Sequence, residues 1–156
     1  MTAQERLAGY LQQQGVEFSL HHHSQAYTAQ EVAASEHVSG HRFVKVVMVK
    51  GDDDLAMMCV PASLDVDLDA AAEVLHTDYV RLAYEEEFAP VFDDCEVGAM
   101  PPFGNLYDVP VYLDETLEED DKIVFNGGTH RETFEMSVDD FERLVHPKVA
   151  HFSTMH

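Results

Sequence analysis

The stretch FVKVVMVKGDDDLAMMCV, residues 43–60, decides the fold. Its two halves, 43–49 and 55–60, are rich in β-branched and other apolar residues, and GDDD at 51–54 is typical of a hairpin turn. We therefore expect two strands joined by a tight turn. Alternation along the first strand separates two sets of side chains: Phe43, Lys45, Val47 and Val49 on one face, and Val44, Val46, Met48 and Lys50 on the other.

Capping and turn signals divide the rest of the chain into short elements. TAQE at 2–5 and TAQE at 28–31 are capping boxes, which predict a helix ending at Gly15 and a second helix through residue 36, before a turn at 39–40. Further helices are expected at 68–76, at 85–92 and after a cap at Ser137. Strands are expected at 16–22, 79–82, 109–113, 122–125 and 131–136.

This order of elements predicts an α+β domain. Hairpin-like strand pairs are mixed with short helices, and the regular βαβ alternation of a doubly wound parallel sheet is absent. No linker or repeat divides the 156 residues, so we expect one domain over 1–156. The tail 148–156 has no clear pattern and is expected at the periphery.

The charge is strongly acidic: nine Lys and Arg against 30 Asp and Glu give a net charge of −21, spread along the chain. The even spread favours adaptation to a salty cytoplasm, where the Debye length is about 3 Å at 1 M, over an ordinary acidic protein. No signal peptide precedes Cys59 and Cys95, and no apolar run approaches the roughly 18 residues of a membrane helix. We expect a cytoplasmic protein with two reduced thiols and with neither a membrane nor DNA as partner.

Lys45 is out of place on the otherwise apolar face of its strand. A buried ammonium is costly unless it is paired or bound to an anion. One interpretation is a cation in a pocket wall that binds a phosphate or carboxylate. The other is an edge strand from which the lysine extends to water.

Two glycine-containing segments are candidates for substrate contacts. In GAMPPFG, 98–104, two prolines fix the backbone and glycines allow close approach, so backbone N–H groups could face an ester carbonyl; a rigid connector is the alternative. NGGTH, 126–130, could cradle a ribose or phosphate or be a plain hairpin turn, and it lacks P-loop spacing. His130 could donate to a substrate or be an ordinary surface histidine.

The histidines at 21–23 are the one indication of a metal, but only His21 and His23 share a strand face. A zinc site needs three or four converging ligands, and four further candidates are not spaced to supply them: Cys59, Cys95, His37 and His41. We expect no metal and no cofactor, with a metal-dependent hydrolase on these histidines as an alternative. No GxSxG elbow or recognisable cysteine context appears, so no covalent nucleophile is expected.

Segments in order from about residue 26 to 147 resemble the YbaK / prolyl-tRNA-synthetase-associated editing family. They are YTAQEVA (27–33), VKVV (44–47), VRLA (80–83) with EEE (85–87), GAMPPFG (98–104), VYLDE (111–115) and IVFNGGTH (123–130). Each segment alone is weak evidence, whereas the ordered set is specific.

The resemblance implies a strongly curved mixed sheet with flanking helices, and a trans-editing deacylase that serves translation fidelity. Such an enzyme hydrolyses the ester of a mischarged tRNA, here a small amino acid such as alanine or cysteine on tRNA for proline. Lys45, Gly98 and Pro102 match the family's catalytic positions: the lysine orients the terminal adenosine, the loop backbone holds the aminoacyl carbonyl, and water attacks with help from the ribose hydroxyl. The expected substrate-binding residues are Tyr27, Thr28, Ala99, Met100, Pro101, Phe103, Gly104, Asn126, Gly128, Thr129 and His130.

The expected partner is the acceptor end of a mischarged tRNA, and prolyl-tRNA synthetase is a candidate partner. Two features depart from this picture: HRF at 41–43 matches no assignable motif, and a charge of −21 disfavours contact with the RNA backbone. We therefore expect binding of the charged end only. The alternative is a non-catalytic module of the same fold that binds aminoacyl-tRNA or a synthetase.

Overall fold

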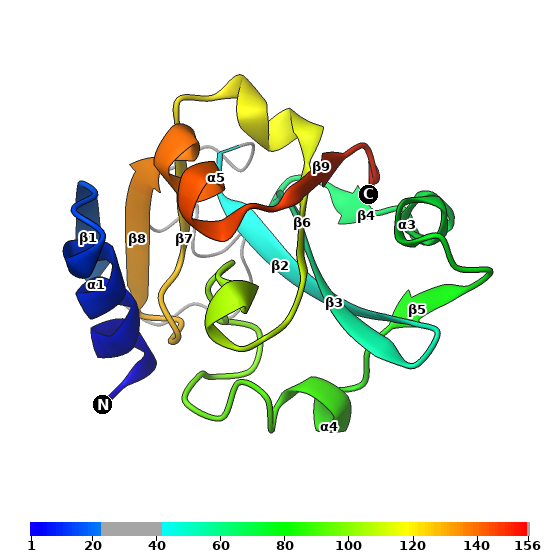
Figure 1. Cartoon of the computed structure of the whole chain (residues 1–156), viewed down its shortest axis with the longest axis horizontal. Helices are drawn as coiled ribbons and strands as arrows, with labels where there is room; N and C mark the ends of the chain where they lie inside the picture. Colours follow the sequence, from blue (N-terminus) through cyan, green and yellow to red (C-terminus); the bar gives the residue numbers. More distant parts are fainter. Residues whose placement is uncertain (23–41, 156) are drawn as a thin grey trace.

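The computed structural model of the chain describes residues 1–22 and 42–155 (Figure 1). Its strands are β1 (Phe18–His22), β2 (Val44–Gly51), β3 (Asp54–Pro61), β4 (Asp65–Val66), β5 (Val80–Leu82), β6 (Val111–Asp114), β7 (Lys122–Asn126), β8 (Glu132–Ser137), β9 (Lys148–Ala150) and β10 (Ser153–Thr154). The α-helices of the described residues are α1 (Ala3–Gln13), α3 (Leu68–Leu75), α4 (Glu85–Phe88) and α5 (Val138–Val145), with 3₁₀ turns η1 (Gly104–Leu106) and η2 (Glu115–Glu119).

The central feature is the β2–β3 hairpin predicted from the sequence. The two strands pair antiparallel from Val44 opposite Pro61 to Gly51 opposite Asp54. Asp52 and Asp53, at the turn, both have positive φ angles, as in the type I′ turn that suits the twist of paired strands. The predicted alternation is confirmed, because Val44 and Met48 pack in one hydrophobic cluster and Val49 packs in another.

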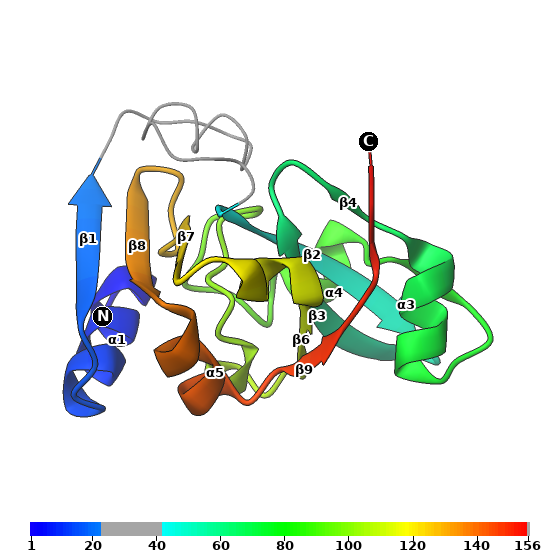
Figure 2. The ribbon, with the colours of Figure 1, turned by 90° about the horizontal axis from the view of Figure 1, so that it is seen from above.

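The strands form a five-stranded sheet in the order β5-β2-β3-β6-β9 and a three-stranded sheet in the order β1-β8-β7. Parallel β3–β6 and β6–β9 pairs beside antiparallel pairs make the larger sheet mixed, which confirms the α+β class. A single parallel bridge joins Phe43, just before β2, to Val124 of β7, so the two sheets adjoin where β2 begins. Figure 2 shows α1 beside β1 at one end of the molecule and α3 at the other.

The aromatic core lies between the three-stranded sheet, its helices and one face of the β2–β3 hairpin. Phe125 and Phe134 stack at 5.9 Å between ring centroids, and Phe103 meets Phe141 edge-on at 5.4 Å. On the opposite face of β2 and β3, α3 and the C-terminal segment cover a smaller cluster that includes Val49, Val60 and Phe152. Both faces of the hairpin are therefore buried.

Local signals fix most helix ends as predicted. The Thr2 hydroxyl accepts from the Glu5 N–H at 3.1 Å, Gly15 takes a φ of 71° after α1, and the Ser137 hydroxyl accepts from the Asp140 N–H at 3.1 Å. The helix predicted over 85–92 is wrong in length, because α4 ends at Phe88. Pro90 follows closely and has no N–H to donate, so the chain continues in turns.

The tail is not peripheral, contrary to the prediction for 148–156. β9 pairs with β6, β10 pairs with β4, and Phe152 is fully buried. The buried Asp114 carboxylate accepts from the N–H groups of Phe152 at 2.8 Å and Ser153 at 3.0 Å. An acceptor almost 40 residues earlier in the chain therefore holds a segment whose own sequence shows no pattern.

Several predictions lie outside the described residues: the capping box at 28–31 with its helix, and the turn at 39–40. No helix within 1–22 and 42–155 is long and apolar enough to cross a bilayer.

Candidate functional site

Two loops that the sequence singled out lie against each other. We name residues 96–104 the proline loop and residues 126–130 the histidine loop. The Gly128 N–H donates to the Ala99 carbonyl at 2.9 Å, and the Glu96 N–H donates to the Gly128 carbonyl at 2.8 Å. These two backbone hydrogen bonds join the loops at the carboxyl end of β7.

His130 is fixed at this junction by Glu96. Its backbone N–H donates to Glu96 Oε1 at 2.9 Å, and its ring Nδ1 lies at the same distance from that oxygen. The backbone hydrogen bond from His130 is the main cause that lowers the pKa of Glu96. The His130 side chain is only 7% exposed, and a Cβ added to Gly98 would lie 3.4 Å from its Nε2. The imidazole therefore stands beside Gly98.

Gly98 meets the geometric requirement expected of the first loop glycine. It is exposed and has a φ of 85°, in the left-handed region that side chains disfavour. Ala99, Met100, Pro101 and Pro102, which follow it, are buried. The loop thus presents its Gly98 end to solvent on a rigid, buried base.

Phe103 and Gly104 are accounted for by packing. The Phe103 ring is fully buried among aromatic rings, with its centroid 5.6 Å from that of Phe125. A Cβ on Gly104 would lie 2.5 Å from the Val109 carbonyl oxygen, so only glycine fits. The structure thus gives both residues a role in holding the proline loop on the core.

Lys45 has a counterion. Its Nζ lies 2.9 Å from Asp65 Oδ1, and its side chain is 24% exposed. Phe43, two residues before Lys45, is bridged in parallel to Val124, two residues before Asn126. Lys45 therefore follows the point at which the chain adjoins β7, the strand that leads into the histidine loop.

Asn126 carries an unusual buried acceptor. The residue is 6% exposed, and its Oδ1 is buried without a hydrogen bond from any residue in the described part of the chain. A buried acceptor without a donor is costly.

The remaining predicted residues are distributed as follows. Gly128 has a φ of 106°, and a Cβ there would lie 2.6 Å from Ala3 Cβ, so glycine is required for the approach of α1. The Thr129 hydroxyl accepts from the Arg131 N–H at 3.1 Å. Tyr27, Thr28, His23, His37 and His41 lie outside the described residues.

Neither cysteine is an activated nucleophile, and the described histidines on β1 belong to no metal cluster. Burial raises the pKa of the Cys59 thiol, and it raises that of Cys95 to about 12. Both therefore stay protonated and weakly nucleophilic at neutral pH. His21 and His22 are exposed on β1. Within 1–22 and 42–155, no group of three or more His, Cys, Asp or Glu side chains could hold a metal ion.

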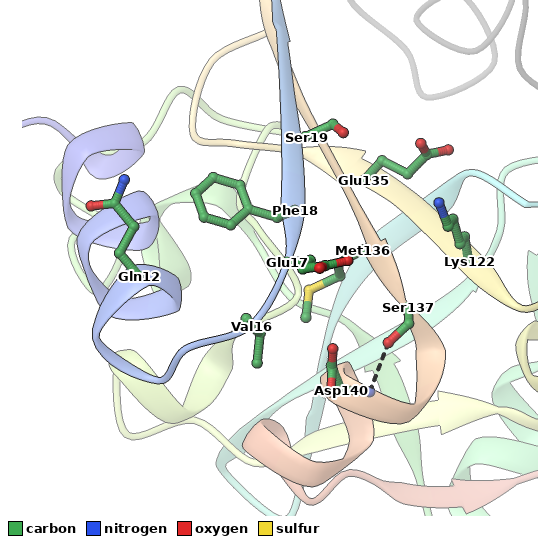
Figure 3. A pocket seen from close by; sticks show the side chains of 10 residues that line it. All are labelled: Gln12, Val16, Glu17, Phe18, Ser19, Lys122, Glu135, Met136, Ser137 and Asp140. Carbon is green, nitrogen blue, oxygen red and sulfur yellow. Dashed lines mark hydrogen bonds between the residues drawn. The ribbon is translucent and has the colours of Figure 1, made fainter.

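A groove of about 730 Å³ lies elsewhere, between the end of α1, β1, β8 and the start of α5 (Figure 3). Glu17, Glu135, Asp140 and Lys122 supply its charges. It contains none of the predicted site residues, and the Ser137 hydroxyl in it is engaged in capping α5. Its acidic lining disfavours RNA, so we place the candidate site at the two loops.

Sequence reasoning missed Glu96 and Asp65, the carboxylates that hold His130 and Lys45. Both lie in stretches where acidic residues are common, and the chain has 30 of them. No local pattern distinguishes a carboxylate that will meet a partner from one that faces solvent.

Comparison with known proteins gives one family and several solved structures of similar fold. A family model described as an aminoacyl-tRNA editing domain matches residues 23–144. A solved structure described as a candidate trans-editing enzyme for prolyl-tRNA synthetase is 24% identical, covers 99% of this chain and 98% of its own, and has a TM-score of 0.83. A hypothetical protein of known structure is 21% identical, with 95% and 99% covered and a TM-score of 0.86. No curated protein matches. At these identities the structures establish the fold alone.

Proposed function

The chain belongs to the aminoacyl-tRNA editing domain family, and on that premise we propose that it is a deacylase acting in trans on mischarged tRNA. Its substrate is the ester of a small amino acid such as alanine or cysteine, carried by tRNA for proline. Prolyl-tRNA synthetase is the candidate partner, in line with the description of the similar solved structure.

The contact between the proline loop and the histidine loop is the observation that supports this function most directly. Of the backbone N–H groups in the proline loop, those of Glu96 and Ala99 have acceptors, whereas those of Val97, Gly98, Met100, Phe103 and Gly104 donate to no described residue. Pro101 and Pro102 have no N–H, and Ala99 donates to Glu96. The N–H groups of Gly98 and Met100 flank Ala99, whose carbonyl joins the two loops, and on this rigid loop they are suited to hold the ester carbonyl as negative charge develops on its oxygen.

Lys45 is proposed to orient the terminal adenosine. An ammonium has three N–H donors, and Asp65 accepts one of them. The others are then directed to a phosphate or ribose oxygen. His130, held by Glu96 beside Gly98, contacts the substrate from the opposite loop.

Hydrolysis proceeds by attack of water, assisted by the ribose hydroxyl of the substrate. An aminoacyl ester is already activated, so positioning and charge stabilisation supply much of the acceleration without a protein nucleophile. Selection among aminoacyl groups depends on the size of the pocket. One methylene contributes only about 1–3 kcal/mol of discrimination, so the pocket excludes large amino acids better than it separates small ones.

The basic side chains support recognition of the charged end rather than the tRNA body. Six of the nine lie within 4 Å of a carboxylate of the described residues: Arg6, Arg42, Lys45, Lys50, Arg81 and Arg143. Neutralisation of phosphates by lysine and arginine normally supplies affinity for the RNA backbone. Few side chains remain for that purpose.

A deacylation panel tests the function. Wild type, Lys45→Ala and the control Lys148→Ala, an exposed lysine on β9, are incubated with alanyl-, cysteinyl- and seryl-tRNA at low and at molar KCl. We expect ester loss from at least one small aminoacyl-tRNA, a fall of about 100-fold in kcat/KM for Lys45→Ala and no change in the control. Intact esters in every case would instead indicate a non-catalytic binding module.

A further inference from the structure

Arg6, on helix α1, contacts the segments that enter and leave the proline loop. Its Nη1 lies 3.7 Å from Asp94 Oδ2, just before the loop. Its Nη2 donates to the Leu106 carbonyl, and its guanidinium lies 4.5 Å from the centroid of the Tyr107 ring, just after the loop. One arginine therefore touches both ends of the loop.

Asp94 and Tyr107 complete the connection. The Tyr107 hydroxyl donates to Asp94 Oδ1 at 2.9 Å. This hydrogen bond joins the two ends of the segment 94–107, which contains the proline loop. The Tyr107 ring packs on Phe92 with 4.6 Å between centroids, and Cys95 Sγ lies 3.5 Å from the tyrosine oxygen. Burial raises the pKa of Tyr107, so the phenol keeps the proton that it donates.

We propose that Arg6, Asp94 and Tyr107 form a clamp that positions the proline loop for ester hydrolysis. This inference rests on the proposed function of the loop. Joining the ends of a short segment restricts the conformations that the segment can sample. The backbone N–H groups of Gly98 and Met100 are thereby held in one arrangement before the substrate arrives.

Helix α1 also backs the histidine loop, which extends its role to the whole site. Ala3 lies so close to Gly128 that a Cβ on the glycine would come within 2.6 Å of it. Leu7 and Leu11 anchor the same helix in the aromatic core. The helix thus sets both loops relative to each other, although it precedes the residues 23–144 that match the family model.

The clamp residues are positioning residues, since their contacts are with the proline loop's flanks and not with its N–H groups. A displaced loop loses interactions that matter most in the transition state, which lowers kcat more than it raises KM. A misplacement of about 1 Å can cost about 100-fold in rate.

The test uses Tyr107→Phe, which removes only the hydroxyl, and Arg6→Met. The matched control is Arg143→Met. It removes the ion pair between Arg143 and Asp140 on α5, in which the arginine side chain is 57% exposed. Deacylation kinetics and backbone hydrogen exchange over residues 97–104 are measured for each protein. We expect kcat to fall about tenfold in Tyr107→Phe and about 100-fold in Arg6→Met, with KM within about twofold and faster exchange in the loop. The control should match wild type.

Wild-type kcat in both clamp variants, or unchanged loop exchange, would overturn the clamp. Faster exchange throughout the three-stranded sheet would also overturn it, because it would indicate general destabilisation. If Arg6→Met does not fold, Tyr107→Phe decides alone. A wild type that hydrolyses no ester refutes the proposed function separately, while loop exchange still reports on the clamp.

Discussion

Replacing Gly98 with alanine separates the function of the proline loop from its contribution to stability. Gly98 has a φ of 85°, and an L side chain in the left-handed region costs about 1–2 kcal/mol. The new Cβ would lie 3.4 Å from His130 Nε2, close to ordinary contact, so the steric cost is small. For a chain of 156 residues this loss lowers Tm by about 2–8 °C.

The expected effect on activity is larger than the effect on stability. The alanine methyl group would stand beside the His130 ring, and relief of the backbone strain at the positive φ moves the loop backbone or that ring. Either movement displaces a group proposed to contact the reacting ester. We expect kcat to fall about 100-fold while the protein remains folded.

Two other glycines provide controls. Gly15→Ala shares the positive φ, at 71°, but has nothing within 4 Å of the added Cβ, so Tm should fall similarly with kcat unchanged. Gly9→Ala lies inside α1 with open space around it and should stabilise the fold by about 0.5–1 kcal/mol. Thermal melts and alanyl-tRNA deacylation measure both quantities. Wild-type kcat in Gly98→Ala, or equal losses of kcat in Gly98→Ala and Gly15→Ala, would refute the reasoning.

Two further predictions concern stability. Burial, then a hydrogen bond with Glu118 and repulsion from nearby carboxylates, raises the pKa of Glu142 from 4.5 to about 7. The native state then holds a proton that the unfolded state loses, so the stabilisation is full below about pH 4.5 and is lost as pH rises towards 7. Glu142→Gln should flatten this part of the pH dependence in urea unfolding, and an unchanged slope would contradict the shift. Phe152→Ala, in the buried tail, should lower the free energy of unfolding by about 3–5 kcal/mol. Val149→Ala, at a site 37% exposed, should lower it by less than about 1 kcal/mol. Equal losses in the two variants would show that the tail is not anchored by Phe152.

The parts of the fold that sequence predicted are those with local causes. The β2–β3 hairpin follows from two apolar runs and a turn of aspartates, and the ends of α1 and α5 follow from Thr2, Gly15 and Ser137. The error in α4 is also local, since Pro90 interrupts a segment whose acidic first turn favours a helix.

The tail and the site counterions could not be predicted in the same way. β9 and β10 are short, and their stability depends on Asp114, β4 and β6, which are distant in sequence. Glu96 and Asp65 likewise acquire their partners only when separate loops and strands meet. The composition of the proline loop indicated a rigid element, but not that α1 would hold its two ends.

The pairing of basic side chains bears on how such an acidic protein could be an effective editing enzyme. Lys50 and Arg81 share the carboxylate of Glu87, and Arg42 pairs with Glu135, so these cations contribute little to phosphate binding. On the proposed function, affinity must then come from the terminal adenosine and the ester. Binding energy realised next to the reacting bond can act on the transition state, whereas affinity for the tRNA body lowers KM without raising kcat. An acidic surface therefore costs the enzyme RNA affinity but not the interactions that drive hydrolysis, provided that Lys45 and the two loops are held in place by carboxylates and by α1.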